Sequence, residues 1–99
     1  MQRDYAADFV REMGCTEQDW LRWLPAALGV HSWRITGAHC AVQIHQGSLM
    51  LSWTTLEPLR MGWVHMPRLQ VQFVFSELDE QQRLQFMRRF DLYMQRGGG

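Results

Sequence analysis

The stretch His39-Cys-Ala-Val-Gln-Ile-His-Gln-Gly-Ser-Leu-Met-Leu-Ser-Trp-Thr54 decides the fold class of this chain. Apolar residues occupy every second position on each side of Gln46-Gly47, first at Cys40, Val42 and Ile44 and then at Leu49, Leu51 and Trp53. Alternation with a period of two is typical of a strand with one buried face, and a glycine between two such runs is typical of a tight turn. The stretch therefore predicts an antiparallel hairpin with one apolar and one polar face.

Strand patterns continue on both sides of this hairpin. Residues 33–36, followed by Gly37, predict a short strand leading into it, and residues 69–75 show the clearest alternation in the chain. Residues 59–66 are apolar on both parities and fit a further strand, with Met66-Pro67 marking a bulge or a sheet edge. This part of the chain thus predicts a mainly antiparallel sheet of four strands. Residues 59–66 would contribute a further strand to it.

Helical spacing marks the two ends of the chain. Residues 4–13 place Tyr5, Phe9, Val10 and Met13 on one helical face, ahead of a glycine that suits a C-cap. Thr16-Glu-Gln-Asp19 reads as a capping box that opens a second helix, which ends at Gly29. Because Pro25 lacks a backbone donor, we expect this second helix to kink or restart there.

The last element is predicted to be a long helix capped by Asp79 with Gln82 three residues later. Its apolar seam consists of Leu84, Met87, Phe90 and Met94. We therefore expect residues 1–99 to form a single α+β domain. It would contain two N-terminal helices, a four-stranded mainly antiparallel sheet, and the long C-terminal helix packed on one sheet face.

Composition limits the classes of partner. The formal net charge is zero, which argues against a dedicated nucleic-acid or membrane-surface protein, because those normally carry a basic excess. The residues before position 10 include acids and no apolar signal region, and Cys15 and Cys40 are the two cysteines. Two thiols without a signal peptide predict a reduced, cytoplasmic protein that does not enter a membrane.

No motif predicts a catalytic, metal or cofactor site. His39 and His45 share a strand face, but six residues of strand separate them by about 20 Å, so one metal ion cannot bind both. Cys40 lies on the buried parity of its strand, where burial makes a thiol inert, and acids surround Cys15. Paired carboxylates occur in first turns of predicted helices, where capping explains them. These observations favour a non-catalytic protein and leave an enzyme open.

Two sets of polar residues are candidates for binding. The polar face of the sheet forms a possible binding face through Gln43, His45, Arg68, Gln70 and Gln72. The candidate anion contacts are Arg60, Arg88 and Arg89. All ten basic Lys or Arg positions are arginine, whose guanidinium binds carboxylate and phosphate as a fork, although codon bias in a GC-rich genome is the preferred explanation of this usage.

Asp91 in the last helix has two alternative interpretations. It lies three residues from Arg88, and an exposed pair at that spacing would contribute only about 0.3–0.5 kcal/mol. If instead Asp91 and an arginine lie between helix and sheet, they form a structural ion pair or part of a polar pocket. The spacing alone leaves both alternatives open.

Two segments resemble known sequences. They are Phe86-Met-Arg-Arg-Phe-Asp-Leu-Tyr-Met-Gln-Arg-Gly-Gly98 and Met66-Pro-Arg-Leu-Gln-Val-Gln-Phe73. On the strength of these segments the chain resembles, over most of its length, small proteobacterial proteins of similar length that have no assigned activity. The resemblance implies a bacterial cytoplasmic setting and no reaction, cofactor or catalytic residue.

Three functions remain as hypotheses. The preferred one is a non-catalytic interaction module that binds itself as a homodimer, or another protein, because residues 59–66 and the last helix carry more apolar side chains than one core requires. The second is a small-molecule or anion binder, with a pocket lined by Trp53, Trp63 and an arginine. The third is single-stranded RNA binding on the polar sheet face, which is disfavoured because the strand aromatics take the core parity.

Overall fold

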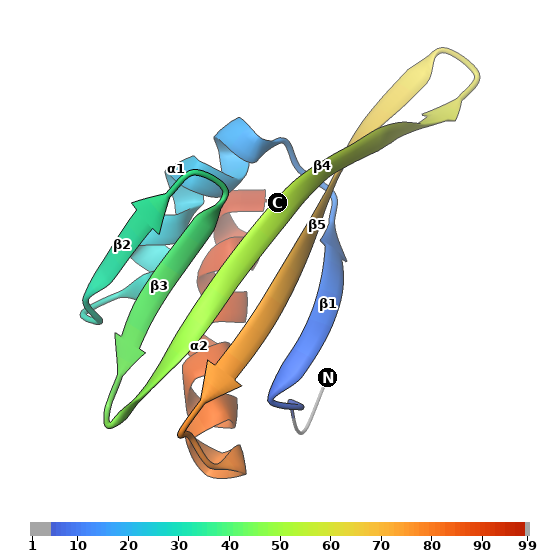
Figure 1. Ribbon diagram of the computed structural model, residues 1–99. Coiled ribbons are helices and arrows are strands. Elements are labelled where there is room, and N and C mark those ends of the chain that lie inside the picture. The colour runs from blue at the N-terminus through green and yellow to red at the C-terminus, as the bar shows by residue number, and fades with distance from the viewer. Residues whose placement is uncertain (1–4, 99) are drawn as a thin grey trace.

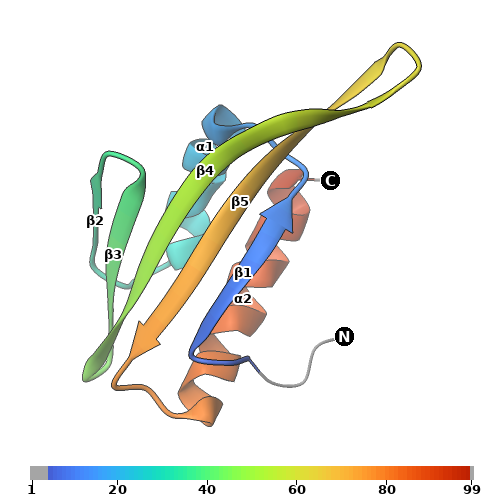
Figure 2. The ribbon, with the colours of Figure 1, turned by 45° about the vertical axis from the view of Figure 1, so that its right-hand side comes forward.

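A computed structural model describes residues 5–98 of the protein, with side chains through Gln95. Within this range the chain forms five strands and two helices, in the order β1 (Asp8–Met13), α1 (Glu17–Leu28), β2 (Trp33–Thr36), β3 (His39–Ile44), β4 (Gly47–Met61), β5 (Val64–Ser76) and α2 (Glu80–Gly98). The strands form one antiparallel sheet in the order β1-β5-β4-β3-β2. Both helices cover the same face of this sheet (Figures 1 and 2).

The core lies between the helices and the sheet. Alternate residues of the three central strands point into it and are buried, as the predicted hairpin requires: Cys40, Val42, Ile44, Leu49, Leu51, Trp53, Leu69, Val71, Phe73 and Phe75. From the helices, Trp20 and Phe90 complete this layer with ring centroids 6.0 Å apart. Aromatic pairs in such tilted contacts add about 0.5–1.5 kcal/mol beyond their buried area.

The first predicted helix is wrong. Residues 8–13 of the predicted 4–13 segment form the edge strand β1, which pairs with the final strand β5, and residue 4 lies outside the described part of the chain. Phe9 and Met13 are four residues apart, a spacing that places two side chains on one face of a helix and equally of a strand. Val10 separates the two readings, since it is 57% exposed on the opposite face from Phe9, which stacks on Phe73 at 4.6 Å.

The predicted count of four strands is also wrong. The structure has five because β1 joins the sheet, whereas residues 59–66 add no separate strand. These residues form the tip of the β4–β5 hairpin, turning at Gly62-Trp63 with a φ of 62° at Gly62. Apolar residues on both parities thus belong to two paired strands.

The other two helices form as the capping residues predict. The Thr16 hydroxyl accepts from Asp19 N at 3.0 Å, and α1 continues through Pro25 to a C-cap at Gly29. The restart expected as one alternative at Pro25 therefore does not occur. At the start of α2, Gln82 N donates to Asp79 Oδ1 at 2.8 Å and Asp79 N donates to Gln82 Oε1 at 3.0 Å. This reciprocal pair satisfies two otherwise unpaired backbone donors.

Candidate interaction surface

The β4–β5 hairpin projects beyond the rest of the sheet as a two-stranded arm, residues 57–67 (Figures 1 and 2). The arm extends past α1 and β1, so neither helix covers it, as both views show. Its length contributes to a molecule whose principal extents are 47 × 30 × 22 Å. An isolated two-stranded ribbon has little intrinsic stability in water, so a partner that covers the arm would stabilise it.

The arm is amphipathic. Leu59 pairs with Met66 and Met61 pairs with Val64, and directly opposed residues share one face of an antiparallel ribbon. These four side chains are 42–65% exposed, so one face of the arm is entirely apolar and open to solvent. The pair Arg60 and His65 lies on the other face. At the tip, Trp63 is 90% exposed.

An irregularity in β4 gives the arm its apolar face. The register shifts between Leu56, which pairs with Arg68, and Leu59, which pairs with Met66. One extra residue in β4 at this point reverses the parity of the strand, as a β-bulge does. Leu59 and Met61 consequently lie on the side of the sheet away from the helices, instead of on the core side that Leu51 and Trp53 occupy.

This side of the sheet, which we call the open face, continues the apolar face of the arm. Its residues alternate with the core residues of each strand: Asp8, Val10, Glu12, Gln70, Gln72, Val74, Met50, Ser52, Thr54, His39, Ala41, Gln43, Arg34 and Thr36. Most are polar, but Val10 and Met50 are 57% and 42% exposed. Asp8, Val74, Met50, Ala41 and Arg34 are register partners and form one row across all five strands.

Four of the five residues of the predicted binding face lie on or beside the open face. Gln72 Nε2 donates to Asp8 Oδ1 at 3.2 Å, and Gln43 Nε2 donates to the carbonyl oxygen of Gly47 at 3.2 Å. Arg68 Nη2 lies 2.8 Å from Glu12 Oε1, and Gln70 is exposed. Their role in binding stays a prediction.

His45 does not belong to this face. It follows β3 in the turn to Gly47 and adopts a φ of 50°, so the strand alternation ends before it. Its side chain lines a cavity on the helix side of the sheet instead. The sequence prediction extended the strand by one residue too many.

The three candidate anion contacts do not form one cluster. Arg60 is on the polar face of the arm. Arg88 and Arg89, neighbours on α2, line two different cavities, because consecutive helical residues point about 100° apart. Nor do Trp53 and Trp63 form the predicted shared pocket, since the first is buried in the core and the second is at the arm tip.

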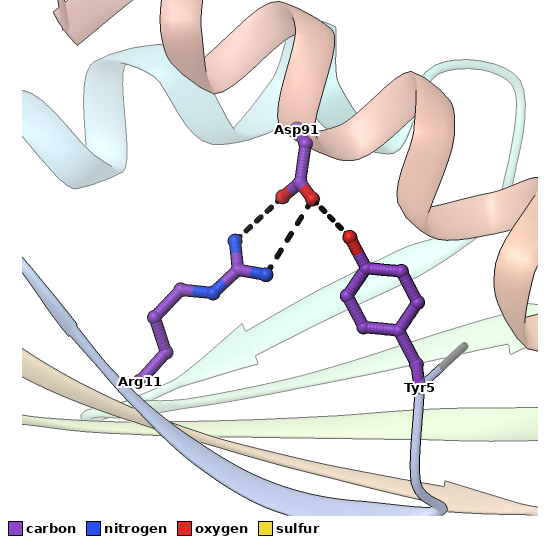
Figure 3. A network of polar contacts seen from close by, with 3 residues as sticks. All are labelled: Tyr5, Arg11 and Asp91. Atoms are coloured by element: carbon purple, nitrogen blue, oxygen red, sulfur yellow. Dashed lines mark hydrogen bonds and ion pairs between the residues drawn. The ribbon is translucent and has the colours of Figure 1, made fainter. Parts of the chain in front are cut away.

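A polar network links β1 to α2 (Figure 3). Tyr5 Oη donates to Asp91 Oδ2 at 2.5 Å, and Arg11 Nη1 donates to Asp91 Oδ1 at 2.5 Å. The Arg11 guanidinium also lies 5.4 Å from the centroid of the Phe73 ring. This is the second of the two alternatives for Asp91, with Arg11 in place of Arg88 as its partner. A sequence reading that assigns β1 to a helix cannot find it.

Electrostatics support a structural role for this network. Burial raises the pKa of Tyr5, and the Asp91 carboxylate raises it further. Burial lowers the pKa of Arg11, but the hydrogen bond and charge of Asp91 outweigh that effect and the net pKa is raised. The raised pKa values keep the Tyr5 hydroxyl and the Arg11 guanidinium protonated, so both can donate to Asp91. A cavity of about 660 Å³ lies beside them, lined also by Arg88 and Leu92.

Three further features concern metal binding, the two cysteine thiols and membrane-spanning helices. The described residues form no group of three or more His, Cys, Asp or Glu side chains suited to a metal ion. Cys15 and Cys40 are free and buried, and burial raises the pKa of both thiols. Among residues 5–98, no helix is long and apolar enough to cross a membrane.

Comparison of this chain with protein-family models, with curated proteins and with solved structures gave no match in any of the three.

Proposed function

We propose that this protein is a non-catalytic interaction module that forms a homodimer through the arm and the open face. The observation that carries the proposal is the exposed apolar face of the arm, formed by Leu59, Met61, Val64 and Met66. An apolar surface on a projecting ribbon costs free energy in water unless a partner covers it. A setting in the bacterial cytoplasm is part of the proposal, and the two free thiols support it.

The row across the open face argues for a second copy as the partner. The row begins with Asp8 on one edge strand and ends with Arg34 on the other, with Met50 on the central strand between them. A two-fold axis parallel to the strands and passing by Met50 reverses this row. Asp8 then faces Arg34 of the second copy, and Val74 faces Ala41. The same axis makes both arms project in one direction with their apolar faces together, which is an isologous contact.

Burial of the arm alone does not contribute enough free energy to hold two copies together, so the open face must also take part in the contact. Fully burying a large apolar side chain contributes about 1.5–3 kcal/mol, so each half-exposed side chain of the arm contributes about 1 kcal/mol. Eight such side chains in two copies give about 8 kcal/mol, which is comparable with the 4–15 kcal/mol cost of association. Contacts across the open face must supply the remainder, and a standard interface of about 800 Å² per partner includes them.

RNA binding is the weaker alternative. Base stacking requires aromatic rings on the exposed face. The open-face residues named above include no Phe, Tyr or Trp, and the central aromatic side chains Trp53, Phe73 and Phe75 are buried on the helix side. The structure offers no observation that favours this function over self-association.

Sedimentation equilibrium over a range from about 1 to 200 µM tests the proposal, because that range brackets the association constants expected of a modest interface. Met61→Ser combined with Val64→Ser should weaken the dimer at least about 100-fold, since each 1.4 kcal/mol is a factor of ten and the loss occurs twice per dimer. The matched control is Arg60→Ser combined with His65→Ser, the adjacent pair on the polar face. A monomer throughout the range, or equal effects of the two double variants, would refute the proposal.

Charge reversal tests the symmetry. Asp8→Arg alone and Arg34→Asp alone should each weaken the dimer, because two like-charge contacts replace two ion pairs. The double variant should restore most of the affinity. A dimer that depends on the arm but does not respond to either reversal would preserve self-association and exclude this two-fold arrangement.

A further inference from the structure

A second cavity of about 340 Å³ lies on the helix side of the sheet, where the β3–β4 turn meets α2. Its polar lining consists of His31, His45, Arg89, Gln82 and Gln85. Phe86 gives it an apolar wall, with its ring centroid 5.5 Å from that of His31. None of its lining residues belongs to the arm or to the open face, so the cavity takes no part in the proposed dimer contact.

Three separate elements bring the cationic groups together. His31 comes from the loop between α1 and β2, His45 from the turn between β3 and β4, and Arg89 from α2. Gly29 makes room for the arginine, since a Cβ atom at that position would lie 2.5 Å from Arg89 Nε. The arrangement depends on the tertiary fold, because these residues are 14 to 58 positions apart in sequence.

The charges of this cavity are not balanced within the described residues that line it. None of those residues is Asp or Glu. Burial lowers the pKa of His31, the charges of His45 and Arg89 lower it further, and a hydrogen bond with the Gln43 backbone opposes them. No carboxylate contributes to this shift. Like charges that converge without a counter-ion are the usual surroundings of a bound anion.

We propose that this cavity binds the oxyanion group of a small molecule, a phosphate or a carboxylate, between Arg89 and the two histidines. The guanidinium supplies a permanent charge and paired donors. The histidines add donors and charge when they are protonated, and the two glutamine amides can complete the hydrogen bonds. A volume of about 340 Å³ is at the lower limit for ligand cavities, so the ligand is a small metabolite with an apolar part that contacts Phe86.

Arg89 also has a structural role, which the test must separate from binding. Its Nη2 donates to the Ala26 carbonyl oxygen at 3.3 Å near the end of α1, and its guanidinium lies 4.4 Å from the centroid of the Tyr93 ring. Helix α1 has no basic residue in its own last turn, so Arg89 supplies favourable charge to that terminus. Loss of stability in an Arg89 variant therefore says nothing about the ligand, and the histidine variants carry the test.

Proton–nitrogen NMR spectra of the whole chain, titrated with inorganic phosphate or with acetate at constant ionic strength, test the proposal. At about pH 6, where a bound anion would favour the protonated form of His31, we expect saturable shifts at residues 29–31, 43–46 and 82–89. The pKa of His31, read from its ring protons, should rise on binding, and affinity should fall at least about tenfold by pH 8. Stronger binding of phosphate than of acetate would identify a phosphorylated ligand, and the reverse a carboxylic acid.

Variants make the test specific. His31→Gln and His45→Gln should each weaken binding at least about threefold and flatten its pH dependence. Arg89→Lys, which keeps the charge but loses the fork, should weaken it as well. The matched control is Arg88→Lys, whose side chain lines the other cavity. No saturable shift with either anion at about pH 6 would overturn the proposal, and so would equal effects of the Arg88 and Arg89 variants in correctly folded protein.

Discussion

The contact between Arg11 and Asp91 allows the sharpest test of how the sheet and helix are held together. Arg11 Nη1 lies 2.5 Å from Asp91 Oδ1, and the two side chains are 25% and 33% exposed. Replacing Asp91 with alanine removes the charge partner of Arg11 and the acceptor for the Tyr5 hydroxyl. Arg11 would then remain half-buried against Phe73 without a carboxylate.

The expected cost lies between two known limits. Exposed ion pairs contribute about 0.2–1 kcal/mol, whereas removing one partner of a fully buried pair costs about 3–5 kcal/mol. Since this pair is about two-thirds buried and includes a charged hydrogen bond from Tyr5, we expect Asp91→Ala to cost about 2 kcal/mol. For a domain of this size, about 2 kcal/mol lowers Tm by roughly 8–16 °C.

Urea unfolding followed by tryptophan fluorescence measures this free energy. Arg11→Met keeps the apolar stem and should cost a similar amount, and the double variant should reveal a coupling of at least about 1 kcal/mol. The matched control is Arg22→Met, which removes an arginine from the exposed pair with Asp19 and should cost less than about 0.5 kcal/mol. If Arg11→Met and Arg22→Met have equal effects, or if the coupling is zero, the network does not stabilise the fold as argued.

Three further predictions follow from burial, close packing and protonation. Cys15 and Cys40 should react with a thiol reagent at least about 100-fold more slowly in the folded protein than in urea, and rapid labelling of the folded protein would contradict their burial. Gly47→Ala should destabilise the protein by about 1–3 kcal/mol, because its Cβ would lie 2.2 Å from a backbone oxygen of β5. Gly14→Ala, where open space surrounds the Cβ, should be nearly neutral, and equal losses would refute the packing argument. Burial first, and then the charge of His45, lowers the pKa of His31, so the unfolded chain binds more protons below about pH 7. Stability should therefore fall from about pH 7 to 5.5, and His31→Gln should reduce that slope in calorimetric scans; an unchanged slope would contradict the assignment.

The candidate surfaces were only partly predictable. Parity along the strands correctly places Gln70 and Gln72 on the face away from the helices, because successive strand residues point to opposite sides. Parity fails at His45, where a turn with a positive φ ends the strand. It fails again at Leu59, where the bulge reverses the sides and no local residue signals by how much.

The sequence by itself determines the elements whose signals are local. Thr16 and Asp79 begin α1 and α2 because their side chains bond backbone donors three residues away. The β3–β4 hairpin and the core strand β5 follow from unbroken alternation, which only a half-buried strand satisfies. These elements establish an α+β domain with an antiparallel sheet.

Features that join residues far apart in sequence are decided only by the tertiary structure. The spacing of Phe9, Val10 and Met13 favours a helix for residues 8–13. Pairing with β5, about 60 residues away, selects the strand instead, because it stacks Phe9 on Phe73 and adds backbone hydrogen bonds at the edge of the sheet. The same pairing brings Arg11 to Asp91. The arm, the open-face row and the cationic cavity likewise join residues that no local pattern connects, because long-range packing free energy outweighs weak local preferences.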